Sequence, residues 1–127
     1  DKRIASVLSV GTHASTFGGN PLACSAAIAV IQTFEDDKIL EHCKEISSYL
    51  ISELNKIKSD KIQQVRGRGL MLGIVVNADV KKIINTAASK GLLILQAGEG
   101  VIRLLPPLII NKSEVDTAVE ILSECLK

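Results

Sequence analysis

One face of the segment from residue 39 to residue 57 carries an apolar residue at nearly every helical turn, with Lys, Glu and Ser between. The residues on this face are Ile39, Cys43, Ile46, Leu50, Leu54 and Ile57. Spacings of three and four residues place these side chains on one side of an α-helix, which would have about five turns. Because such a helix must bury its apolar face, the chain has to supply a second layer for it to pack on.

The other apolar runs are short, and they are the candidates for that second layer. Residues 70–76 (LMLGIVV), 92–95 (LLIL) and 101–105 (VIRLL) are each predicted to form a strand. Two prolines follow the last run, and proline cannot continue a ladder of hydrogen bonds. Residues 64–69 (QVRGRG) break the helical pattern without forming an apolar run.

Two further amphipathic helices accompany these strands. The first has an apolar face between residues 80 and 88 and ends at Gly91, the usual position for a glycine that terminates a helix. The last helix is predicted to open at Ser113, with Asp116 three residues later in a capping-box arrangement. Its expected core-facing residues are Val115, Val119, Leu122 and Leu126.

An alanine-rich helix is predicted near the start of the chain. Asn20 can cap its free N–H groups, and Pro21 is tolerated at the first helical position. Small residues on several of its faces predict that it is buried or shared between two domains. The expected division is an N-terminal part, residues 1–37, containing this connecting helix, and a domain of residues 38–127.

The predicted fold class is α+β. The domain would have a small sheet of three or four short, largely antiparallel strands covered by helices on one side, with the connecting helix before it. Aromatic residues make up only 2% of the chain, so the core must be aliphatic.

Composition excludes several classes of function. The net charge of +1 gives no electrostatic case for nucleic acid or for acidic membranes. The scarcity of aromatic residues argues against binding of single-stranded nucleic acid, whose bases usually stack on aromatic side chains. No apolar run reaches the roughly 18 residues that a membrane helix needs.

The isolated histidines and three unpaired cysteines favour structural roles and free thiols over a metal site or disulfides. A start at Asp1, with Met71 as the only methionine, suggests a piece of a longer protein.

The segment from Gly11 to Cys24 (GTHASTFGGNPLAC) carries the first candidate chemistry. Ser15 and Thr16 precede two glycines and a helix start. Glycines let a backbone approach an anion closely, and hydroxyl groups near a helix N-terminus suit phosphate oxygens. Taken alone, such a stretch is more often only a loop.

Three arginines are the other candidates. Arg103 stands in an apolar strand, on the face expected to carry Val101 and Leu105. A charge there is costly unless it is paired or the face is wet. Its planar fork suits a substrate carboxylate. Arg66 and Arg68 in VRGRGLMLG could hold an anion, but we expect the glycines to permit a tight entry into a strand and these arginines to face solvent or surface carboxylates.

These segments resemble the class III family of aminotransferases that depend on pyridoxal phosphate. The residues that carry the resemblance are HASTFGGNPLAC (residues 13–24), VRGRGLMLG (65–73) and VIRLLPPL (101–108), and it extends from Gly11 to Leu126. It implies the last segment of the large domain followed by the small C-terminal domain of the enzyme.

The resemblance also implies roles for particular residues. Thr16, with Ser15 beside it, would bind the phosphate of pyridoxal phosphate held by the neighbouring subunit, in a homodimer with composite active sites. Arg103 would bind the carboxylate of an amino-acid or 2-oxoacid substrate. The family's cofactor-binding lysine lies upstream, and no lysine here stands in a matching motif. We therefore expect no catalytic residue and no covalent cofactor in this chain.

The expected reaction of the parent enzyme is transfer of an amino group between N-acetylornithine and 2-oxoglutarate, in arginine biosynthesis in the cytoplasm. The segment around Leu93, Leu95, Ala97 and Gly98 is most similar to that branch of the family. Ornithine, 4-aminobutyrate and succinylornithine remain alternative donors. A non-catalytic α+β binding or dimerisation module also remains open.

Overall fold

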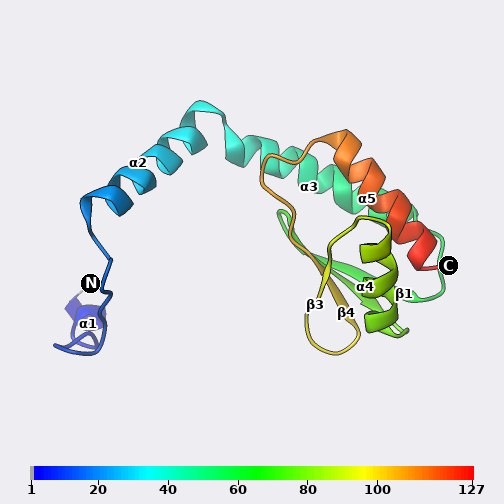
Figure 1. Cartoon of the computed structure of the whole chain (residues 1–127), viewed down its shortest axis with the longest axis horizontal. Helices are drawn as coiled ribbons and strands as arrows, with labels where there is room; N and C mark the ends of the chain where they lie inside the picture. The colour runs from blue at the N-terminus through cyan, green and yellow to red at the C-terminus, as the bar shows by residue number, and fades with distance from the viewer. Residues whose placement is uncertain (1) are drawn as a thin grey trace. The chain divides into compact units, whose positions relative to one another are not determined.

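The chain forms two compact units. The computed structural model describes the backbone of residues 2–127 and the side chains from residue 4 onward. Unit 1 comprises Asp1–Asp37 and unit 2 comprises Lys38–Lys127. Figure 1 shows the elements of both units along the chain.

Unit 1 consists of a short helix, a loop and a longer helix. The helices are α1 (Lys2–Ala5) and α2 (Pro21–Asp36). The predicted start of α2 is confirmed: the Asn20 side chain accepts a hydrogen bond from the backbone N–H of Ala23, and Pro21 is the first helical residue. None of the residues of α2 is buried within this unit, which offers no second layer on which α2 could pack. The expectation that α2 is buried is therefore not met inside unit 1, and the alternative, that it is shared between two domains, stays a prediction.

Unit 2 is an α+β domain, as predicted. Its elements are α3 (Ile39–Lys56), β1 (Ile62–Arg68), β2 (Met71–Val76), α4 (Val80–Ser89), β3 (Leu95–Gln96), β4 (Val101–Leu104) and α5 (Lys112–Cys125). The strands form one antiparallel sheet in the order β1-β2-β4-β3. In Figure 1, α5 lies along α3, and α4 lies beside β3 and β4.

The two central strands divide the sheet into a buried face and an outer face. Leu72, Ile74 and Val76 of β2 are buried, whereas Met71 is exposed. In β4, Ile102 and Leu104 are buried on the same side. Successive residues of a strand point to opposite faces, so this alternation marks the core side. The helices fill that side with Ile46, Leu50, Leu54, Val80, Ile83, Ala87, Val115, Leu122 and Leu126.

Two strand predictions need correction. Residues 62–68 form β1, although the sequence around 64–69 shows no apolar alternation. The reason is that β1 lies at the edge of the sheet with most of its residues exposed, so it needs few apolar side chains. The strand predicted at 92–95 is reduced to Leu95–Gln96, and the buried Ile94 before it packs into the core without pairing.

The capping box of α5 was predicted two residues too late. The N-cap is Asn111, not Ser113: its side chain accepts from the Glu114 N–H, and the Glu114 carboxylate accepts from the Asn111 N–H. An asparagine with a glutamate three residues on satisfies both free donors, which removes the need for a second cap at Ser113.

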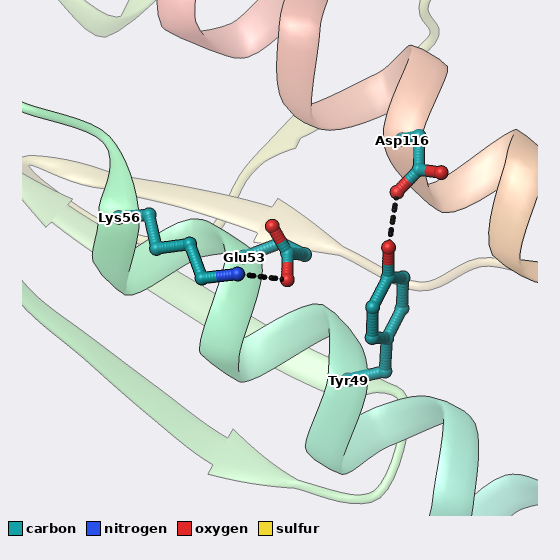
Figure 2. Close-up of polar contacts among 4 residues, drawn as sticks. All are labelled: Tyr49, Glu53, Lys56 and Asp116. Atoms are coloured by element: carbon teal, nitrogen blue, oxygen red, sulfur yellow. Dashed lines mark hydrogen bonds and ion pairs between the residues drawn. The ribbon is translucent and has the colours of Figure 1, made fainter.

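Asp116 instead connects α5 to α3. The Tyr49 hydroxyl donates to the Asp116 carboxylate over 2.6 Å. Figure 2 shows this contact beside the ion pair of Lys56 with Glu53, which lies along α3 itself. The Lys112 ammonium lies 5.6 Å from the centre of the Tyr49 ring, so a second residue of α5 contacts the same side chain.

The hydrogen bond to Asp116, helped by burial, raises the pKa of Tyr49 from 10.0 to about 12. A raised pKa in the folded state means that this contact stabilises the fold fully below pH 10 and loses its effect as the pH rises toward 12.

Tyr49 is the only tyrosine, so tyrosinate absorbance reports it alone. We expect Asp116→Asn to lower the midpoint toward 10.0 while circular dichroism shows a folded chain. A midpoint near 10.0 in the folded wild type would contradict the contact.

Candidate functional site

The loop before α2 is fixed by short-range hydrogen bonds. The Ser15 hydroxyl accepts from the Gly18 N–H over 3.0 Å, and the Asn20 amide donates to the carbonyl of Phe17. A Cβ on Gly18 would lie 2.9 Å from the Ser15 Cβ, and Gly19 has a φ of 76°. Both positions therefore require glycine, because a side chain would either collide or strain the backbone.

This loop holds its two predicted phosphate-binding residues in different ways. Within residues 2–127, the exposed Thr16 hydroxyl makes no hydrogen bond. The Ser15 oxygen accepts from Gly18, which leaves the hydroxyl hydrogen available for a ligand. At the start of α2, Pro21 has no N–H and that of Ala23 is capped by Asn20. The Ser15 and Thr16 hydroxyl groups are therefore donors that the loop can offer to an anion.

The composition of the loop fits a phosphate. Residues 11–20 contain two adjacent hydroxyl side chains, several glycines and no carboxylate. Uncharged donors on a close-approaching backbone are suited to phosphate oxygens, and a neighbouring carboxylate would have opposed them. The loop therefore has the composition of a phosphate-binding segment, with the Ser15 oxygen already bonded to Gly18.

Arg103 lies on the outer face of the sheet in unit 2. Its side chain is half-buried, and its Nε atom is buried with no hydrogen-bond partner. Together with Arg66, Arg103 lines a hollow of about 330 Å³, which we call the arginine hollow. Its other lining residues are Gly67, Met71, Leu72, Gly73, Ala97 and Val101. A buried guanidinium nitrogen without a partner is costly, so this site is ready for an acceptor such as a carboxylate.

The expected neighbours of Arg103 are only partly found. Val101 lines the arginine hollow, as strand alternation predicts. Leu105 lies beyond the last residue of β4 and lines a larger hollow of about 730 Å³. The larger hollow is mostly apolar, and its only charged lining residue is Glu114. The cations that could pair with a carboxylate therefore line the smaller hollow, not the larger one.

Arg66 and Arg68 are both exposed, as expected, and neither is paired with a carboxylate within residues 4–127. The glycine between them supports the predicted tight backbone, since a Cβ on Gly67 would lie 2.2 Å from the Met71 carbonyl oxygen. Sequence reasoning missed that Arg66 shares a hollow with Arg103. The signal that could have found it was Gly73, which stands opposite Arg66 when strands β1 and β2 are paired.

The described residues show few other candidates for chemistry. No lysine lines either hollow. The Nε2 of His42 donates to the Ile110 carbonyl, 2.9 Å away, and holds the segment before α5 against α3. Over residues 2–127 we find no cluster of metal-ligating side chains and no helix long and apolar enough to cross a membrane.

The fold is one found in aminotransferases, since the chain superimposes on the crystal structure of an acetylornithine aminotransferase from Elizabethkingia anophelis with a TM-score of 0.85 at 34% identity, over 99% of this chain and 35% of that one. The sequence profile of the family described as "Aminotransferase class-III" matches residues 1–126. The chain belongs to this family.

Named relatives and a solved structure extend the comparison. The chain is 42% identical over 114 residues to an acetylornithine aminotransferase of Methanosarcina mazei, covering 90% of this chain and 29% of the relative. It is also 42% identical over 120 residues to an ornithine aminotransferase of Staphylococcus carnosus, covering 94% and 30%. The crystal structure of a Toxoplasma gondii ornithine aminotransferase, reported with partial occupancy of PLP at the active site, superimposes with a TM-score of 0.81 at 29% identity, over 97% and 31% of the two chains. The chain thus spans under a third of the length of these proteins.

The unpaired Nε of Arg103 generates a stability prediction. Arg103→Met should raise the free energy of unfolding by about 1–2 kcal/mol, because it removes a buried polar atom that has no partner. Urea denaturation of the chain measures this change. The matched control is Arg66→Met on the exposed edge strand, which should change stability by less than about 0.5 kcal/mol. If Arg103→Met lowers the free energy of unfolding and Arg66→Met does not, the Arg103 side chain stabilises the fold.

Proposed function

We propose that the chain is the C-terminal part of a pyridoxal-phosphate-dependent enzyme that moves an amino group between N-acetylornithine and 2-oxoglutarate. The observation that carries this proposal is Arg103, a half-buried guanidinium with an unpaired Nε in a hollow that contains no carboxylate. Membership of the class III aminotransferases supports the type of reaction. Residues 1–37 would close the large domain and connect it to the small domain, residues 38–127.

The cofactor in this proposal is pyridoxal phosphate, which supplies the electron sink for amino transfer. This chain would contribute to its binding through the phosphate group alone. The Thr16 hydroxyl donates to a phosphate oxygen, and the Ser15 hydroxyl adds a second donor while its oxygen stays bonded to Gly18. In a homodimer with composite sites, these donors serve the cofactor of the partner subunit.

Arg103 is the proposed substrate-binding residue. Two parallel N–H groups of its fork bind the carboxylate that amino-acid and 2-oxoacid substrates share. That contact fixes the orientation of the reacting carbon without taking part in proton transfer. No residue of this chain is assigned to proton transfer, and the reactive lysine is expected elsewhere in the protein, so this chain alone would be inactive.

Ornithine is the strongest alternative amino donor. Relatives named acetylornithine aminotransferase and ornithine aminotransferase are equally similar, at 42% identity each. Arg103 would bind the carboxylate common to both donors and does not discriminate between them. We place N-acetylornithine first because of the segment around Leu93, Leu95, Ala97 and Gly98. An enzyme of this kind would act in arginine biosynthesis in the cytoplasm.

The function is tested by assaying the whole protein that contains this segment, with pyridoxal phosphate and 2-oxoglutarate, against four donors. N-acetylornithine should give the highest kcat/KM, and ornithine, 4-aminobutyrate and succinylornithine lower values. Glutamate formation measures each rate. A clear preference for another donor would overturn the substrate assignment while keeping the class, and no transfer from any donor would favour a non-catalytic binding module.

The role of Thr16 is tested by cofactor retention. Thr16→Ala should weaken binding of pyridoxal phosphate to the whole protein by about 1–3 kcal/mol, because a charged phosphate oxygen loses a hydroxyl donor. Thr16→Ser should retain most of the affinity. The matched control is Thr12→Ala in the same loop, whose hydroxyl donates to the Ser9 carbonyl. Equal affinity in Thr16→Ala and the wild type would remove Thr16 from the site.

A further inference from the structure

Three residues on adjacent strands form one row across the outer face of the sheet. Gly73 of β2 is paired with Arg66 of β1 on one side and with Arg103 of β4 on the other. Residues paired across antiparallel strands point to the same face, so both arginines rise from the same side. Since neighbouring strands are about 4.8 Å apart, the two arginine backbones are separated by about 10 Å.

The glycine in the middle of this row leaves the space between the arginines open. A Cβ on Gly73 would lie 3.2 Å from a methyl carbon of Val101 and 4.0 Å from the Cγ of Arg66. The stem of Arg66 therefore passes beside the floor of the hollow that Arg103 lines from the opposite strand. A side chain at position 73 would crowd Val101 and lie beside the stem of Arg66, on the floor of the hollow.

The charges around this row are all positive. Arg66 and Arg103 are the only charged residues that line the hollow. Neither makes a hydrogen bond or ion pair within residues 4–127, where the ion pairs found are those of Lys56, Lys90 and Lys112. Two cations that face one hollow without a counter-charge repel each other, and an anion bound between them relieves this repulsion.

We propose that Arg66 is a second carboxylate-binding residue, and that one substrate carboxylate binds over Gly73 between the guanidinium groups of Arg66 and Arg103. This inference rests on the proposed function of Arg103 and extends it to a residue on a different strand. One carboxylate oxygen accepts from the terminal N–H groups of Arg103, whose side chain is half-buried at the hollow. The other oxygen accepts from Arg66, which closes the open side of the hollow.

The chain supplies a matched control for the charge of Arg66. Arg68 lies two residues further along β1, on the same face, and is paired with Met71 instead of Gly73. It does not line the arginine hollow. Arg68→Gln therefore removes the same charge from the same strand and face without touching the proposed site.

Direct binding tests the inference independently of enzymatic activity. The chain is titrated with pentanoate, a simple monocarboxylate, while NMR follows the Nε–H signals of its arginines. We expect the signals of Arg66 and Arg103 to shift together with one Kd and that of Arg68 to stay unchanged. Arg66→Gln should raise the Kd by about 10-fold, the loss of one charged hydrogen bond, and Arg68→Gln by less than about 2-fold.

A variant that keeps both arginines tests whether pentanoate contacts them directly or is only attracted by their charge. Gly73→Val places a side chain on the floor of the hollow, beside Val101 and the Arg66 stem, and should raise the Kd for pentanoate at least as much as Arg66→Gln. An unchanged Kd in Gly73→Val, or equal effects of Arg66→Gln and Arg68→Gln, would overturn the shared site. Circular dichroism of each variant identifies any loss of fold.

Steady-state kinetics of the whole protein give the second readout. Arg66→Gln should raise KM for the amino donor and for 2-oxoglutarate by a similar factor, about 10-fold, with kcat little changed, as expected for a contact made equally throughout the reaction. A rise confined to 2-oxoglutarate would overturn the shared carboxylate. If Arg103→Gln raises KM and Arg66→Gln does not, the inference fails while the function proposed for Arg103 stands.

Discussion

Burial of one face of the sheet is the constraint on which unit 2 depends. Leu72, Ile74 and Ile102 point into the aliphatic core, and the helices α3, α4 and α5 supply the apolar residues that meet them. Burying side chains of this size contributes about 1.5–3 kcal/mol each before entropy is counted. Because strand residues alternate, the same strands that build this core must turn their intervening residues outward. Residues on the outer face need not pack against the helices, so Gly73 and Arg103 can occupy it.

The loop in unit 1 is held in shape by local hydrogen bonds and not by a hydrophobic core. The Ser15 oxygen accepts from Gly18, and Asn20 bonds Phe17 and Ala23, all within three residues. Gly18 and Gly19 make that geometry possible. Such a loop keeps its shape with its side chains exposed, so the Thr16 hydroxyl can remain without a partner. The exposed apolar residues of α2, among them Leu22 and Ile28, indicate that this unit needs a further surface to cover it.

Periodicity in the sequence predicted the elements whose burial is one-sided. The stripe on α3 is recovered because its apolar residues recur with the helical period, and β2 is recovered because its residues form a short, continuous apolar run. The edge strand β1 was not predicted, since exposed Gln64, Arg66 and Arg68 carry no apolar signal. The cap of α5 was misplaced because Ser113 and Asp116 have the same spacing as Asn111 and Glu114, and only backbone geometry distinguishes the two pairs.

The candidate site was predictable only in part, for a related reason. Arg103 was identifiable because a charge in an apolar strand conflicts with its surroundings, and such conflicts mark functional positions. Arg66 gave no such conflict, because an arginine on an exposed edge strand costs little. Its significance arises from the pairing of β1 with β2 and of β2 with β4, which brings residues 37 positions apart into one row through Gly73. Strand register is a property of the assembled sheet, so a site composed of one conspicuous and one ordinary arginine becomes visible only once the sheet is formed.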